Sequence, residues 1–165
     1  MSDTEMLAVK VLEALRQRGL RLATAESCTG GMISAAITDL AGASDVLERG
    51  FVTYSNAAKA EMLGVPPETI SAHGAVSAET ARAMAAGALA HSHADIAVSV
   101  TGVAGPGGGT AEKPVGLVWF GLAVKDKEPR AENRRFLGGE RAIVRRDSVT
   151  TALELVLRTV QADAP

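Results

Sequence analysis

Short apolar runs alternate with amphipathic segments of helical period along the first two-thirds of the chain. In residues 4–18, apolar side chains such as Leu7, Val11 and Leu15 recur at the spacing of one helix face, whereas residues 22–25 and 95–100 are short apolar runs typical of strands. Strands that alternate with helices usually pair in parallel. The pattern therefore predicts an α/β fold.

The same periods predict the remaining elements. We expect helices over residues 4–18, 32–40, 56–63, 78–91 and about 140–161, and strands over 22–25, 46–54, 95–100, 115–124 and 134–137. The last two strands are expected to form a hairpin across the polar residues 125–133. This order predicts a three-layer α/β/α sandwich with a mixed, mostly parallel sheet, in one domain of residues 1–165.

Several residues are suited to begin or end these helices. Thr4 or Asp3 could cap the first helix, and Ser77 is a good N-cap for the alanine-rich helix after it. We expect Gly64 and the Pro66-Pro67 pair to end the helix of residues 56–63, and His73 to lie in a loop.

Small residues dominate the composition, with 30 alanines and 17 glycines against 3% aromatic residues. The core must therefore be built from small and aliphatic side chains, with closely approaching backbones. Few aromatics, and 17 basic against 19 acidic residues, argue against a nucleic-acid ligand. A single cysteine excludes an internal disulfide and favours a reducing compartment. The acidic N-terminus and the lack of a long apolar run indicate neither export nor a membrane span, so we expect a cytoplasmic protein.

The sequence TAESCTGG, residues 24–31, joins a predicted strand to a predicted helix. Free amides at a helix N-terminus can stabilise an oxyanion, and glycines leave the approach open, so Ser27 is a candidate nucleophile. The turn does not match Gly-x-Ser-x-Gly, and ordinary capping by Ser27 or Thr29 is the alternative. Cys28 fits a small core residue better than a nucleophile.

A serine nucleophile needs a base, and the chain offers few. His91 and His93 lie two residues apart near a helix end and would not converge on one ligand, while nothing in the sequence links His73 to the serine. Lys59 follows an apolar strand and could lose its proton if it were buried, although a solvated lysine is the alternative.

A second glycine-rich segment, SVTGVAGPGGGT at residues 99–110, could form an anion-binding concavity or a flexible connection. It matches neither a Walker A loop nor a dinucleotide-binding turn. Arg141 and Arg145 share one face of the last helix and suit a phosphate, with Arg146 beside them; a solvated charged face is the alternative.

Four ordered motifs resemble the CinA C-terminal family: TAESCTGG, GFVTYSNAAK, HGAVS and SVTGVAGPGG with EKPVG. The resemblance covers nearly the whole chain. It implies hydrolysis of the carboxamide of nicotinamide mononucleotide to nicotinate mononucleotide and ammonia, a recycling step in pyridine-nucleotide metabolism.

Carried onto this sequence, the resemblance makes Ser27 the nucleophile, Lys59 its base and Tyr54 a hydroxyl close to both. It implies neither a metal nor a cofactor, and a homo-oligomer by analogy. The substrate-binding residues it implies are Thr29, Gly30, Gly31, Asn56, Thr101, Gly102, Gly105, Gly107, Gly108, Arg141 and Arg145.

Other functions fit the same pocket. One is a non-catalytic nucleotide-binding module with a regulatory role, and another is a hydrolase acting on a different amide or on a phosphate ester. A metal-dependent hydrolase fits least, because the sequence offers no credible cluster of ligands.

Overall fold

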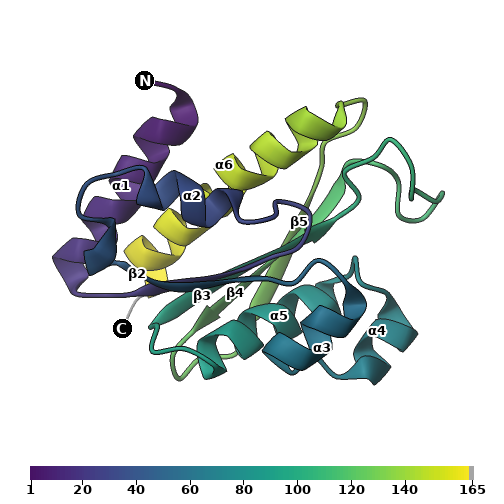
Figure 1. Cartoon of the computed structure of the whole chain (residues 1–165), viewed down its shortest axis with the longest axis horizontal. Coiled ribbons are helices and arrows are strands. Elements are labelled where there is room, and N and C mark those ends of the chain that lie inside the picture. Colours follow the sequence, from purple (N-terminus) through teal and green to yellow (C-terminus); the bar gives the residue numbers. More distant parts are fainter. Residues whose placement is uncertain (164–165) are drawn as a thin grey trace.

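The computed structural model describes residues 1–163, so the last two residues of the expected domain lie outside the described part. A five-stranded sheet lies between two layers of helices (Figure 1). In chain order the elements are α1 (Asp3–Arg18), β1 (Leu22–Glu26), α2 (Met32–Thr38), the 3-10 turn η1 (Ala43–Asp45), β2 (Leu47–Val52), α3 (Asn56–Leu63), α4 (Pro67–His73), α5 (Ala78–Ala90), β3 (Ile96–Gly102), β4 (Leu117–Val124), β5 (Arg130–Arg135) and α6 (Arg141–Asp163).

The strands lie in the order β2, β1, β3, β4, β5. Strand β1 pairs in parallel with both β2 and β3, whereas β4 runs antiparallel to β3 and to β5. The predicted α/β/α sandwich with a mixed, mostly parallel sheet is confirmed. The carboxyl ends of β1, β2 and β3 therefore meet at one edge, where ligands bind in folds of this kind.

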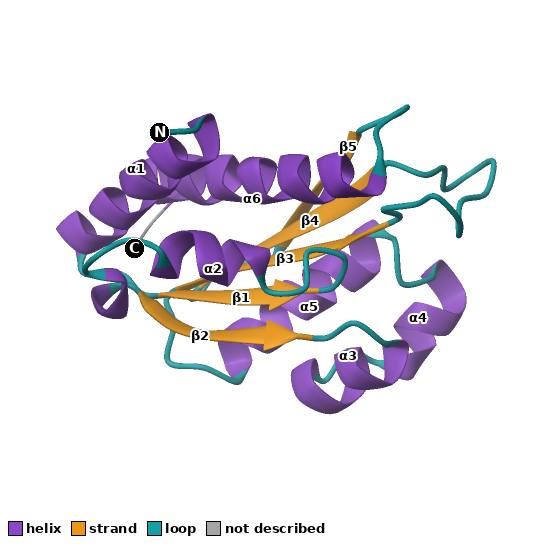
Figure 2. Ribbon diagram, turned by 45° about the horizontal axis from the view of Figure 1, so that its top comes forward, coloured by secondary structure: helices purple, strands orange, loops and turns teal. Residues whose placement is uncertain are grey.

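The two faces of the sheet carry side chains of different size. Helices α1, α2 and α6 cover one face, and α3, α4 and α5 lie on the other (Figure 2). Side chains alternate along each strand, so Leu22 joins the core under α1 and α6 while Ala23 joins the core under α5. Large residues such as Phe120 fill the first core, and the strands contribute alanines to the second.

Helix α5 lies unusually close to the sheet. The Ser99 hydroxyl donates a hydrogen bond to the backbone carbonyl of Ala81, at 2.6 Å. A Cβ atom on Gly121 would lie 2.1 Å from the same carbonyl oxygen, so only glycine fits there. The expectation that small residues allow close approach is confirmed at this layer.

One helix was not predicted, and one predicted strand was misplaced. Residues 67–73 form α4, because Pro67 stands at the start of the helix, where its missing N–H costs nothing. His73 therefore ends a helix. The last strand is β5, not residues 134–137, and β4–β5 is the expected hairpin with a shorter turn. An edge strand that is largely exposed needs no apolar run, so its charged sequence hid it.

The predicted cap of the first helix was also wrong. Ser2, not Thr4 or Asp3, accepts a hydrogen bond from the Glu5 amide, and the Glu5 carboxylate accepts one from the Ser2 amide in return. Ser77 caps α5 as expected. Within residues 1–163, no helix combines the length and the apolar composition that a membrane crossing requires.

Candidate active site

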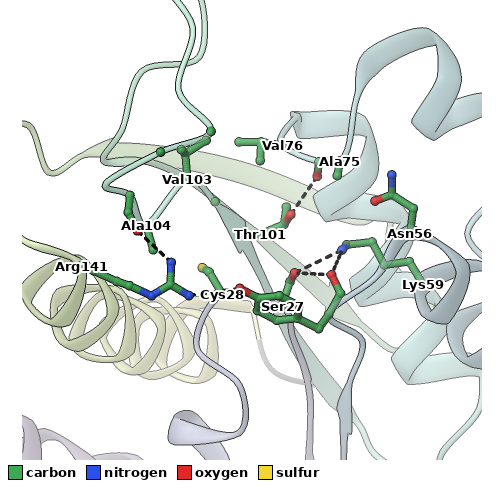
Figure 3. A pocket seen from close by; sticks show the side chains of 15 residues that line it. Ser27, Cys28, Asn56, Lys59, Ala75, Val76, Thr101, Val103, Ala104 and Arg141 are labelled. Carbon is green, nitrogen blue, oxygen red and sulfur yellow. Dashed lines mark hydrogen bonds between the residues drawn. The ribbon is translucent and has the colours of Figure 1, made fainter.

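A cavity of about 310 Å³ opens at the carboxyl ends of the three parallel strands (Figure 3). It is lined from five segments of the chain: the turn after β1, the start of α3, the segment before α5, the end of β3 with its following loop, and the start of α6. The lining residues are Ser27, Cys28, Tyr54, Asn56, Lys59, Ala75, Val76, Thr101, Gly102, Val103, Ala104, Gly105, Gly107, Gly108 and Arg141.

Ser27 and Lys59 meet on one wall of this cavity. The Nζ of Lys59 lies 3.1 Å from the Oγ of Ser27 and 3.1 Å from the backbone carbonyl oxygen of Tyr54. The Ser27 hydroxyl lies 3.4 Å from that same carbonyl, and the Ser27 amide donates to the carbonyl of Val100 on β3. The serine is thus anchored to the sheet through its backbone, with its side chain turned toward the lysine.

Lys59 is buried, with only 2% of its surface exposed, so the solvated-lysine alternative is wrong. It lies in the first turn of α3, which Ser55 caps by accepting from the amide of Ala58. None of the ion pairs formed among residues 1–163 includes Lys59. Burial therefore lowers the pKa of the Lys59 ammonium below its usual range, which favours the neutral amine. A neutral amine beside a hydroxyl can accept its proton.

The structure places Tyr54 differently from the expectation. Its backbone carbonyl, not its phenol, lies against Ser27 and Lys59. The side chain is 61% exposed, and its hydroxyl accepts a hydrogen bond from Arg141 at 3.1 Å. The tyrosine ring thus belongs to the mouth of the cavity.

The three arginines at the start of α6 face different surroundings. Arg141 lines the cavity and donates to the carbonyl of Gly105, at 2.8 Å. Arg145 donates from its Nε to the carbonyl of Cys28 at 3.0 Å and is not among the lining residues. Arg146 lines a separate groove next to the start of α1. Of the three, the structure brings only Arg141 to the cavity.

Glu26, which was not among the predicted site residues, organises the turn that carries Ser27. Its fully buried carboxylate accepts hydrogen bonds from the Thr29 hydroxyl at 2.6 Å and from the amides of Ile33 at 2.9 Å and Ser34 at 3.1 Å. An acidic residue just before a helix was the available signal, because a carboxylate is favourable at a helix N-terminus. Capping by Ser27 or Thr29, the alternative function of these hydroxyls, is wrong.

The predicted binding residues of this turn stand behind Ser27. Thr29 is buried against Glu26, and Gly30 and Gly31 adopt positive φ angles of 57° and 107°, which favour glycine. None of the three lines the cavity. They shape the turn that presents Ser27 and form no part of the cavity wall.

Cys28 is the neighbour of Ser27 and also lines the cavity (Figure 3). Burial raises the pKa of its thiol to about 11, so it stays protonated near neutral pH. This agrees with its expected character as a small buried residue. The imidazoles are elsewhere: His91 contacts the carbonyl of Gly87, and His73 lies 3.6 Å from Glu79. Over residues 1–163 no three metal-ligating side chains gather into a group.

The glycine-rich segment after β3 forms the wall opposite α3. Gly105 and Gly108 adopt positive φ angles of 83° and 85°, and a Cβ atom on Gly105 would lie 2.5 Å from the side chain of Val115. The Thr101 hydroxyl donates to the carbonyl of Ala75 at 2.8 Å, which ties this wall to the segment before α5. Ala75, Val76, Val103 and Ala104 were not expected as lining residues, because small apolar side chains carry no chemical signal in a sequence.

Comparison with known proteins places these residues in a wider group. The family model described as the CinA C-terminal domain matches residues 4–160. The nicotinamide-nucleotide amidohydrolase PncC of Escherichia coli (strain K12) is 51% identical over 156 residues, which cover 93% of this chain and 94% of that protein. A putative competence-damage inducible protein of Caldicellulosiruptor bescii is 46% identical over 96% of this chain, which corresponds to 38% of its own length. The crystal structure of the competence/damage inducible protein CihA from Agrobacterium tumefaciens superposes with a TM-score of 0.93 at 48% identity, covering 98% of this chain and 97% of that one.

Proposed function

The chain belongs to the CinA C-terminal domain family, and we propose that it is an amidohydrolase that converts nicotinamide mononucleotide to nicotinate mononucleotide and ammonia. The observation that carries the proposal is the contact of 3.1 Å between Lys59 Nζ and Ser27 Oγ inside the cavity. The amidohydrolase name of the 51% identical Escherichia coli relative supports the substrate. The reaction belongs to the recycling of pyridine nucleotides, and we place it in the cytoplasm.

The first half of the reaction forms an acyl-enzyme. Neutral Lys59 accepts the proton of the Ser27 hydroxyl while Ser27 Oγ attacks the carboxamide carbon. The tetrahedral intermediate collapses with cleavage of the C–N bond, and the lysine returns the proton to the leaving nitrogen, which departs as ammonia. The contact distance is within the range that proton transfer requires.

The second half releases the product. Water attacks the ester carbon with Lys59 as the base, the bond from the carbon to Ser27 Oγ breaks, and the lysine returns the proton to the serine. Burial of Lys59 serves both halves, since an amine with a lowered pKa is a base at a pH where an exposed lysine is charged.

Two other parts of the cavity are suited to bind the two ends of the nucleotide. Arg141 supplies a guanidinium at the mouth and, with the backbone of Gly107 and Gly108, is suited to a phosphate. Asn56 offers an amide to the nicotinamide end from the first turn of α3. Binding energy at the phosphate orients the carboxamide toward Ser27.

The test is an assay of ammonia and nicotinate mononucleotide formation by the purified chain, beside the Ser27→Ala variant. We expect release by the native chain and none above background by the variant. Binding of the mononucleotide without ammonia release would instead support the regulatory module. Release of inorganic phosphate would indicate a phosphate-ester hydrolase.

A further inference from the structure

We propose that Arg145 is a positioning residue that fixes the backbone of the nucleophile turn so that the amide of Cys28 faces the oxyanion of the reaction. The inference rests on the proposed function, because it assigns the group that stabilises the tetrahedral intermediate. It departs from the expectation that Arg145 binds the phosphate.

The orientation of the Cys28 and Thr29 amides follows from their neighbours. The Gly30 amide donates to the carbonyl of Ser27 at 3.1 Å, and Arg145 Nε donates to the carbonyl of Cys28 at 3.0 Å. In a trans peptide the C=O and N–H bonds point in opposite directions. The Cys28 amide therefore points away from Gly30, and the Thr29 amide points away from Arg145.

These two amides are also unused. Within residues 1–163, neither donates a hydrogen bond to another residue. Most of the next donors along the chain are occupied, since Gly30 bonds back to Ser27 while the amides of Ile33 and Ser34 bond to Glu26. The Gly31 amide makes no such bond, but neither Gly31 nor Thr29 lines the cavity, whereas Cys28 does. The helix N-terminus thus contributes little to a substrate directly. The amide after a nucleophilic serine commonly forms an oxyanion hole, and Cys28 is in that position.

Arg145 contributes charge as well as geometry. Its charge-assisted hydrogen bond holds the carbonyl of Cys28, while the Gly30 amide holds the carbonyl of Ser27, so the peptides on both sides of Cys28 are fixed. The guanidinium packs against the outer side of the turn, where a Cβ atom on Gly30 would lie 3.6 Å from its Nη2. It is half-buried and outside the cavity lining, so it acts on the reaction through the turn.

Helix α6 provides the matched controls. Arg141, one turn earlier, lines the cavity, whereas Arg146 is exposed and lines a different groove. The experiment compares Arg145→Met, Arg145→Lys, Arg141→Met and Arg146→Met for kcat and KM with nicotinamide mononucleotide. A second readout is the rate at which a fluorophosphonate labels Ser27: the Oγ–P bond forms, the P–F bond breaks, fluoride leaves, and the serine proton passes to Lys59.

We expect Arg145→Met to lower kcat by about 100-fold, the usual effect of losing one oxyanion donor, with KM changed less than about threefold. Labelling of Ser27 slows in parallel, and Arg145→Lys restores part of both rates. Arg141→Met raises KM instead, and Arg146→Met changes neither constant. If Arg145→Met does not fold, Arg145→Lys takes its place: a lowered kcat with a nearly unchanged KM and slower labelling of Ser27 is then the expected result.

A raised KM with unchanged kcat in the Arg145 variant would overturn the proposal, because the guanidinium would then bind substrate. Unchanged labelling of Ser27 would overturn it as well. The probe needs no mononucleotide, so the two proposals can fail separately. If the native chain releases no ammonia but Arg145→Met still slows labelling, the positioning role stands and the proposed substrate is wrong.

Discussion

Lys59 Nζ and Ser27 Oγ lie 3.1 Å apart although the residues are separated by 32 positions in the sequence. The parallel pairing of β1 with β2 brings them together, since the turn after β1 and the helix after β2 leave the sheet at the same edge. Two adjacent strand-to-helix connections thus supply a nucleophile and a base. The pair acts as one unit in the proposed reaction.

Removal of either member should therefore abolish turnover. We expect Ser27→Ala and Lys59→Met each to lower kcat by at least about 1,000-fold, as for other nucleophile–base units. Because the two residues act together, the double variant should be little slower than the slower single variant. Ammonia release measures the effect, and Lys125→Met, which changes an exposed lysine on another part of the surface, is the control. Additive losses in the double variant would contradict a coupled pair.

The pH dependence of kcat should report the buried amine. Burial lowers the pKa of Lys59 below the ordinary lysine value of 10.5. At saturating substrate we expect kcat to rise with pH along a single limb whose apparent pKa lies below that value, and to fall about tenfold per pH unit beneath it. A kcat that stays constant down to pH 5 would show that Lys59 is not the base.

The same shift should appear in stability. Between the folded-state pKa of Lys59 and 10.5, the unfolded chain binds a proton that the folded chain does not, so stability rises with pH in that window and is lost as pH falls through the folded-state pKa. Lys59→Met removes this dependence. Near neutral pH we expect Lys59→Met to have the higher free energy of unfolding. Denaturant titrations of both proteins should show this difference in free energy shrinking as pH rises from neutral toward 10.5, by at most about 1.4 kcal/mol per pH unit. A constant difference would mean that the pKa of Lys59 is not lowered.

Arg141 should affect binding more than chemistry. It faces the cavity and joins Gly105 to the Tyr54 hydroxyl at the mouth. We expect Arg141→Met to raise KM by about 10- to 100-fold, as expected from losing charged hydrogen bonds worth about 1.5–3 kcal/mol. Tyr54→Phe removes only the phenol contact and should change KM less than about fivefold. Equal effects of the two variants would assign the binding role to the tyrosine.

The sequence predicted the elements whose side chains are buried with a regular period. Strands β1 and β3 and helices α1, α3 and α5 followed from apolar spacing and from caps such as Ser77. Helix α4 and strand β5 did not, because neither contains a run of buried residues: α4 has none, and β5 is an edge strand. A pattern of hydrophobicity cannot identify an element that has no buried face of its own.

The candidate site was also predicted only in part. Ser27 stood out from its turn and Lys59 was a candidate base, but only the family resemblance paired them. Residue spacing could not, since that contact depends on which strands are neighbours. The spacing of Arg141 and Arg145 correctly indicated a shared helix face. It could not show that one turn of α6 faces the cavity and the next faces the carbonyl of Cys28. These contacts are determined by tertiary packing.

Helix packing around Lys59 gives the last prediction. A Cβ atom on Gly87 in α5 would lie 2.0 Å from the backbone carbonyl oxygen of Leu63, the last residue of α3. Helix propensity alone favours Gly87→Ala by about 1 kcal/mol. The clash involves backbone and cannot be relieved by a side-chain rotation, so we expect a net loss of about 1–3 kcal/mol, the usual cost of overpacking.

Thermal unfolding measures this loss, with Gly107→Ala as the matched control, because its new Cβ would meet no atom within 4 Å and its φ is not positive. We expect the control to unfold within about 0.5 kcal/mol of the native chain. Helix α3 also carries Lys59, so a shift of α3 away from α5 moves the amine relative to Ser27 and should lower kcat together with stability. A Gly87→Ala chain that unfolds at a higher temperature than the native chain would show that the two helices can separate at no cost.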